Sequence, residues 1–198
     1  MFLKNEKFLF NLLLIVFCLF AFKTYSAPED KVEALNYLSS LSDFSASFVQ
    51  SDGESLSEGK VYIGKKRVRA EYFLPTKILI ILAEDKAMYY DYVLEEDEFF
   101  NPKNTNAWFF YDIFRNPLFF EDGKIEIKNN ELLLEKKGID NEEKNFVIRV
   151  LFEKKPLVLR GIEVIINDDI LKLSIYNHSY NEDFDKDFFK LINPKFLN

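Results

Sequence analysis

His178, the only histidine of the chain, is the first candidate for a catalytic base. It stands alone between asparagine and serine, and the single cysteine, Cys18, lies far from it in sequence. The six glycines form no dinucleotide-binding fingerprint, no phosphate-binding loop and no nucleophile elbow. An isolated histidine of this kind is typical of a loop side chain. We therefore predict no catalytic residues and no enzymatic activity.

Three alternating carboxylates, Asp183, Asp185 and Asp187, imitate the first ligands of a calcium-binding loop. Such a loop needs a glycine at its sixth position and a bidentate glutamate at its twelfth. Here these positions hold Phe188 and Pro194. The spacing therefore argues against calcium, and we expect neither a metal site nor a cofactor.

A basic cluster, Lys65, Lys66, Arg67 and Arg69, is the one local reversal of charge in an acidic chain. Two interpretations stay open. The cluster is either the solvated end of a β-hairpin or a group on the rim of a cavity.

Residues 1–26 have the layout of a secretory signal peptide. Lys4 and Lys7 give a basic start, an apolar run of about 15 residues follows, and Thr24 to Ser26 supplies small residues at a cleavage site. A spanning helix needs about 20 apolar residues, so an uncleaved anchor is the less favoured alternative. We expect cleavage after Ser26 and a single exported domain over residues 27–198.

Composition narrows the classes of partner. Without residues 1–26 the net charge is −9, whereas a nucleic-acid-binding protein usually presents a basic face. We therefore expect no nucleic-acid partner. The same stretch contains no cysteine, so it holds no disulfide and no thiolate site.

Hydrophobic periodicity predicts a mainly β protein. An amphipathic helix after Pro28 is followed by about eleven short strands in meander order, the last near residues 188–192, with a second helix at about 106–116. An antiparallel sheet of that length must curl or close. The pattern therefore predicts an incomplete, strongly curved antiparallel β-barrel with helical lids. Its apolar wall either packs as a filled core or encloses a cavity.

Several motifs, in this order and spacing, resemble the periplasmic outer-membrane lipoprotein carriers of the LolA family. They are Leu41 to Gln50 (LSDFSASFVQ), Glu58 to Ile63 (EGKVYI), Val68 to Pro75 (VRAEYFLP), Tyr90–Asp91 with Leu94 to Glu96, and Phe188 to Pro194. The resemblance covers nearly all of residues 27–198.

The resemblance implies a half-barrel carrier in the periplasm. Such a carrier receives triacylated lipoproteins from an inner-membrane ABC lipoprotein-releasing complex, shields their acyl chains and delivers them to an outer-membrane lipoprotein acceptor. We expect a monomer. A lipid-binding sensor, or an acceptor-type protein on the same scaffold, is the alternative.

The residues expected to line the acyl-chain cavity are Val61, Ile63, Val68, Ala70, Tyr72, Leu79, Ile81, Tyr90, Trp108, Tyr111 and Phe114. The family uses an arginine to hold its lid closed. By analogy, Lys65 or Arg67 would donate hydrogen bonds to backbone carbonyls at the ends of the lids.

Overall fold

The computed structural model describes residues 29–116, 118–140 and 142–196. The expected signal peptide and its cleavage site therefore lie outside the described residues. The elements are α2 (Glu29–Ser40), β1 (Phe44–Ser51), β2 (Leu56–Ile63), β3 (Val68–Leu74), β4 (Ile78–Leu82), β5 (Ala87–Asp91), β6 (Glu96–Phe100), η1 (Pro102–Asn104), α3 (Ala107–Arg115), β7 (Lys124–Lys128), β8 (Glu131–Ile139), β9 (Asn145–Lys154), β10 (Leu157–Ile166), β11 (Asp169–Tyr180) and η2 (Pro194–Phe196).

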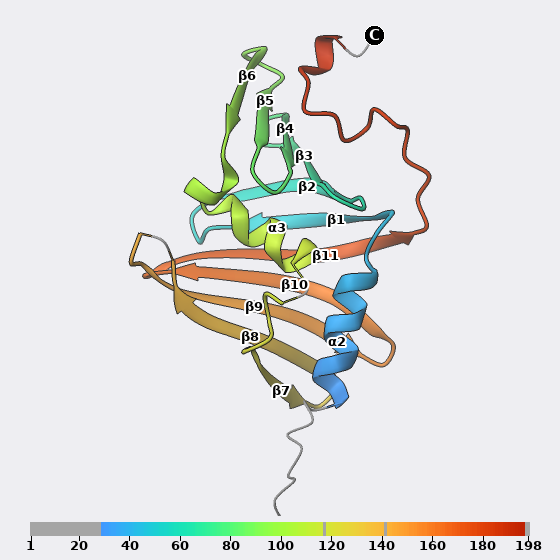
Figure 1. Ribbon diagram of the computed structural model, residues 1–198, viewed down its shortest axis with the longest axis vertical. Coiled ribbons are helices and arrows are strands. Elements are labelled where there is room, and N and C mark those ends of the chain that lie inside the picture. Colours follow the sequence, from blue (N-terminus) through green and yellow to red (C-terminus); the bar gives the residue numbers. More distant parts are fainter. Residues whose placement is uncertain (1–28, 117, 141, 197–198) are drawn as a thin grey trace, which may run out of the picture.

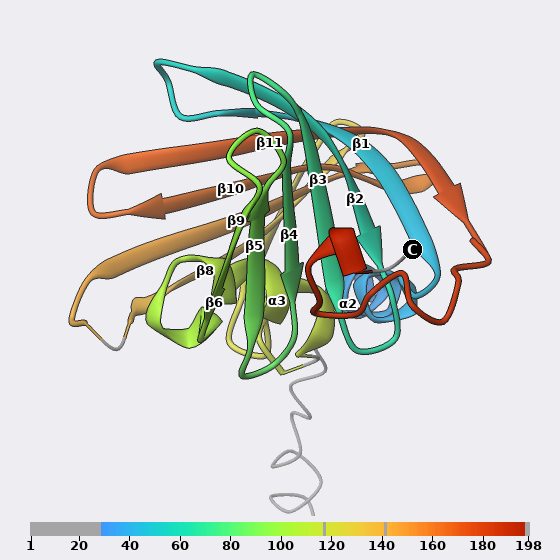
Figure 2. The same ribbon diagram turned by 90° about the horizontal axis from the view of Figure 1, so that it is seen from above.

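All eleven strands belong to one antiparallel sheet with the order β6-β5-β4-β3-β2-β1-β11-β10-β9-β8-β7. Two meanders, β1 to β6 and β7 to β11, are joined where β1 pairs with β11, with Phe48 opposite Ile175. The sheet curves strongly and leaves β6 and β7 as its two edges (Figures 1 and 2). The predicted open, curved antiparallel half-barrel with two helices is confirmed.

Both α-helices lie on the concave face of the sheet (Figure 2). Helix α2 begins with Glu29 and Asp30, which suit the positive end of the helix dipole, and buries Ala34 and Leu38 in the core. Helix α3 is apolar around most of its circumference and crosses the middle of the sheet (Figure 1). Its Phe109 is fully buried in the same core.

The strand predicted near residues 188–192 is wrong: these residues, all of which the structure describes, form none. After β11 the chain leaves the sheet and returns along its outer face as an irregular C-terminal segment, residues 181–196 (Figure 1). Its backbone is held by side chains: Arg67 Nη1 donates to the Phe189 carbonyl at 2.6 Å, and Arg69 Nη1 donates to the Phe188 carbonyl. The apolar pattern predicted a strand because it cannot show that these carbonyls accept hydrogen bonds from arginine side chains instead of from a neighbouring strand.

Among the residues described, no helix has the length and apolar character needed to cross a membrane.

Candidate functional site

An apolar cavity of about 230 Å³ lies between α3 and the concave face of the sheet. Strands β1 to β4 and β10 to β11 form its wall, and α3 covers it. Its lining residues are Phe48, Gln50, Val61, Val68, Ala70, Tyr72, Ile80, Leu82, Asn106, Ala107, Phe110, Phe114, Ile162, Leu171, Leu173 and Ile175.

Five of the residues expected at the cavity line it: Val61, Val68, Ala70, Tyr72 and Phe114. Cross-strand pairing and alternation along β3 explain the first four, because directly paired residues of antiparallel strands share a face, as do residues two apart in one strand. The pairs are Val61 with Ala70 and Ile63 with Val68. Ile63 shares that face but is fully buried in the core without lining the cavity. Whether the five bind acyl chains stays a prediction.

Leu79, Ile81 and Tyr90 were placed on the wrong face. They form a separate cluster on the outer face of the sheet with Met88, and Leu191 of the C-terminal segment packs against it. The reason lies in β4, which is apolar on both faces, so its alternation cannot tell inside from outside. Its cavity residues are the intervening Ile80 and Leu82.

Trp108 and Tyr111 also lie off the cavity. Trp108 packs edge to face against Phe119 and Phe146, with ring centroids 5.9 Å apart in each pair. The face of α3 over the cavity instead carries Ala107, Phe110 and Phe114, which follow helical spacing. Phe110 could not be assigned to the cavity from the sequence, because aromatic residues surround the helix and hide its inward stripe.

Polar atoms reach the cavity lining at few points. Tyr72 Oη donates to Gln50 Oε1 at 2.8 Å, and burial raises the pKa of Tyr72 to about 12. Within the described residues, Asn106 is the other polar side chain of the lining. At neutral pH these groups are uncharged, which suits an apolar ligand better than a charged one.

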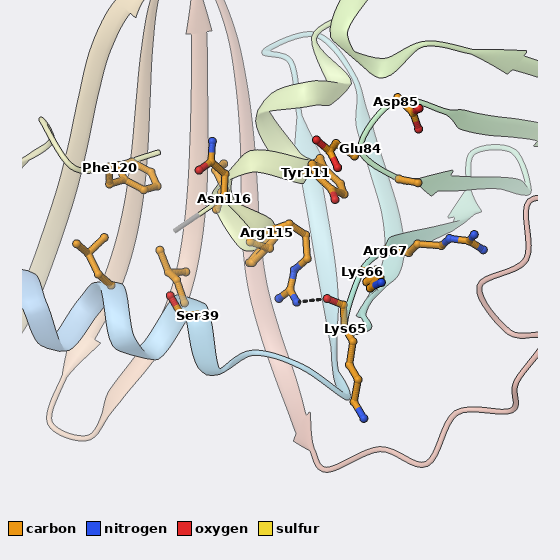
Figure 3. A pocket seen from close by; sticks show the side chains of 15 residues that line it. Ser39, Lys65, Lys66, Arg67, Glu84, Asp85, Tyr111, Arg115, Asn116 and Phe120 are labelled. Carbon is orange, nitrogen blue, oxygen red and sulfur yellow. Dashed lines mark hydrogen bonds between the residues drawn. The ribbon is translucent and has the colours of Figure 1, made fainter. Parts of the chain in front are cut away.

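A latch holds the C-terminal end of α3. Arg115 Nη1 donates to the carbonyls of Gly64 at 3.0 Å and Lys65 at 3.3 Å, and Nη2 donates to the carbonyl of Leu41. These carbonyls belong to the β2–β3 turn and to the chain leaving α2. One guanidinium therefore ties the helix to both neighbours. Figure 3 shows its hydrogen bond to Lys65.

The expected lid donors, Lys65 and Arg67, do not play that role. Lys65 accepts a hydrogen bond through its backbone, and Arg67 points away from Arg115 toward the C-terminal segment (Figure 3). The arginine that holds the lid through backbone carbonyls is on the helix rather than on the hairpin. Burial lowers the pKa of Arg115, but a guanidinium stays protonated at any physiological pH.

His178 lies on β11 rather than in the expected loop. Its Nε2 is 2.6 Å from the Leu159 carbonyl oxygen, which makes Nε2 the donor, and its ring stacks on Tyr180. Partial burial lowers the pKa of the imidazole. These contacts give His178 a structural place between β10 and β11.

Comparison with known proteins establishes the fold alone. No protein-family model and no curated protein sequence match the chain. Among solved structures, an uncharacterized conserved protein from Thermus thermophilus has a TM-score of 0.53 at 10% identity and covers 85% of this chain and 96% of that one. MucB gives a TM-score of 0.49 at 7% identity, covering 83% of this chain and 63% of MucB. The MucA/MucB complex of Pseudomonas aeruginosa gives 0.48 at 9%, covering 81% and 60%.

Proposed function

We propose that this chain is a carrier that shields the acyl chains of lipid-modified proteins in the cavity beneath α3. The observation that supports this most directly is the cavity itself, whose lining is almost entirely apolar and whose cover is a helix latched at one end. The resemblance of the sequence motifs to lipoprotein carriers points to the same cargo. In this proposal the cargo comes from an inner-membrane ABC complex and passes to an outer-membrane acceptor.

The size of the cavity suits transient binding. At about 230 Å³ it is smaller than the roughly 300–1,000 Å³ of most ligand pockets, so it holds only part of a long acyl chain while α3 is closed. Burying a methylene contributes about 0.8 kcal/mol, and complete burial of several chains would make release very slow. Partial burial leaves the cargo free to move to a better acceptor without ATP.

Opening of α3 would enlarge the space. Above the cavity the helix faces the sheet through Ala107, Phe110 and Phe114, and beside it Phe109 packs on Phe146 of β9. Its hydrogen bonds to the rest of the described protein are concentrated at Arg115. A lid of this kind can exchange a few hydrogen bonds and apolar contacts for contacts with cargo. The reaction is binding and transfer, with no covalent step.

Purification from the periplasm, followed by mass spectrometry of co-purifying molecules, tests the proposal. We expect lipid-modified proteins or peptides bound in excess over those on Ala70→Leu, which fills the cavity. A transfer assay to outer-membrane vesicles then separates carrier from sensor, because only a carrier gives up its cargo. Equal recovery of lipid-modified proteins with the wild type and Ala70→Leu would refute acyl-chain binding in this cavity.

A further inference from the structure

The cavity has two neighbouring openings, one at each end of α3. At the N-terminal end lies a wider vestibule of about 770 Å³ with polar and apolar lining residues, bounded by the β1–β2 turn, the β10–β11 hairpin and Lys144. It shares three lining residues, Asn106, Phe110 and Leu171, with the apolar cavity. At the C-terminal end, the pocket around the Arg115 latch has about 550 Å³ and shares only Phe114 with the cavity (Figure 3).

The two ends of α3 are fastened differently. At the C-terminal end, the latch of Arg115 ties the helix to the β2–β3 turn and to the chain after α2. At the N-terminal end, the side chain of Asn106 makes no capping hydrogen bond to any described residue, and the Ala107 amide donates to Thr105 of its own turn at 3.2 Å. The helix is therefore fixed at Arg115 and held at the vestibule mainly by apolar contacts, so a ligand meets less resistance at the vestibule.

The charges around the vestibule determine which polar head group of an acyl-chain ligand can lie there. Its lysines are already paired, Lys172 with Glu163 at 2.9 Å and Lys144 with Glu142 at 2.6 Å. In the described part of the chain, Asp168 and Asp169 of the β10–β11 hairpin form no ion pair. Hydrogen bonds from the Ser55 amide and hydroxyl and the Glu54 amide lower the pKa of Asp52 to about 2, so this carboxylate is ionised at neutral pH. The excess of negative charge opposes an anionic head group.

We infer that the cargo enters at the N-terminal end of α3 and leaves its polar head in this vestibule, and that this head is neutral or cationic. A peptide or glyceryl head on an acyl chain fits this description, whereas a phosphate or a free carboxylate does not. The inference rests on the proposed function and adds to it the direction of the ligand and the class of its head group. Asn106, at the junction of vestibule and cavity, offers an amide to such a head.

Two photoreactive probes test the direction on the unaltered protein. Both are palmitoylated peptides with a neutral head, and they differ only in the diazirine, which is placed on the first residue of the head or at the end of the acyl chain. After irradiation, mass spectrometry locates the labelled residues. We expect the head probe to label residues 51–53 or 167–169 and the chain-end probe to label residues of the cavity alone, such as Leu173 or Ile175.

The outcomes separate this inference from the proposed function. Labelling of residues 65–67 or 83–85 by the head probe, or of neither opening, would overturn the direction while leaving acyl binding intact. If the chain-end probe labels the cavity residues no more strongly than it does in the presence of excess non-photoreactive ligand, the proposed function fails, and the direction fails with it.

A binding comparison tests the head group. The wild type should bind a palmitoyl peptide with a lysine head more tightly than one with a phosphoserine head, by about threefold as expected of exposed charges. Asp168→Lys with Asp169→Lys should abolish or reverse that preference. Glu84→Lys with Asp85→Lys, two neighbouring acids at the opposite opening, serves as the matched control and should leave it unchanged. Equal affinity for both heads in the wild type would overturn this part of the inference.

Discussion

The guanidinium of Arg115 donates to the backbone carbonyl of Lys65, with Nη1 and the oxygen 3.3 Å apart (Figure 3). Lys65, which was expected to donate to the lid, therefore accepts a hydrogen bond from it. The donor, Arg115, belongs to the helix, and its acceptors are backbone carbonyls of the β2–β3 turn and of the chain after α2. Movement of α3 at this end breaks all three hydrogen bonds together, so the latch behaves as a single unit.

Replacement of Arg115 should loosen α3. Arg115→Leu removes three hydrogen bonds from a charged donor, each contributing about 1.5–3 kcal/mol, and we expect the open state to gain population. Nitroxides on Asn116→Cys and Lys66→Cys, both exposed positions beside the latch, should report a longer and broader distance distribution. Arg67→Leu is the control, since it removes an arginine bonded to the C-terminal segment. A change of the same size in the control would place the lock at Arg67 instead.

Filling the cavity should weaken binding without harming the fold. Ala70→Leu adds three carbon atoms to the cavity wall and takes space from about two methylenes of a ligand. At about 0.8 kcal/mol for each methylene, the affinity for a fluorescent palmitoyl peptide with a neutral head should fall about tenfold. Thermal denaturation should show a melting temperature equal to or above that of the wild type. Ser174→Leu, which also replaces a small residue by leucine but at an exposed position of β11, should bind normally; weaker binding there would point to a site on the outer face.

The C-terminal segment should stabilise the protein through Arg69. Its guanidinium donates from Nε to Glu71 at 2.8 Å, reaches the Phe188 carbonyl and lies 4.2 Å from the centre of the Phe188 ring. Arg69→Met should lower the free energy of unfolding by about 1.5–3 kcal/mol in urea denaturation. Arg160→Met is the matched control, because the ion pair of Arg160 with Glu153 is exposed and should contribute less than about 1 kcal/mol. Equal losses in the two variants would contradict an anchoring role for Arg69.

Stability should fall as the pH drops below the ordinary pKa of histidine. Burial lowers the pKa of His178 in the folded state, so near pH 6.5 the unfolded chain binds more protons than the folded one. The free energy of unfolding therefore rises with pH through this region and levels off above it. Because His178 is the only histidine, His178→Gln should flatten the dependence between about pH 5.5 and 7.5. Urea midpoints measured across that range check this, and an unchanged slope in the variant would contradict it.

The alternation of apolar and polar residues predicted the cavity residues of β3 correctly but not those of the neighbouring strand β4. Strand β3 alternates apolar and charged residues, so Val68, Ala70 and Tyr72 could be placed on one face. Strand β4 reads Ile-Leu-Ile-Ile-Leu, and both of its faces are covered, one by the lid and the other by the C-terminal segment. Only the register of β3 with β4, where Ala70 pairs with Ile80, decides which set of alternating β4 residues faces the cavity.

Long-range contacts of arginines could not be predicted from the sequence. Arg115 stands at the end of a helix, where a basic residue is common because it suits the helix dipole. Its three acceptors are backbone carbonyls, which every residue carries, so no spacing marks them. Likewise, the sequence left open whether the basic cluster is a solvated hairpin end or part of a cavity rim. Its arginines in fact donate to the carbonyls of Phe188 and Phe189, which lie more than a hundred residues later.

The pairing of β1 with β11 has a consequence for the order of folding. Strand β1 is among the first elements to leave the ribosome and β11 is the last strand, so the ladder that unites the two meanders cannot form until almost the whole chain exists. Until then the half-sheet β1 to β6 presents β1 as an unprotected edge, ready to pair with any other strand it meets. A chain built in this way stays open to pairing between molecules until β11 has been made.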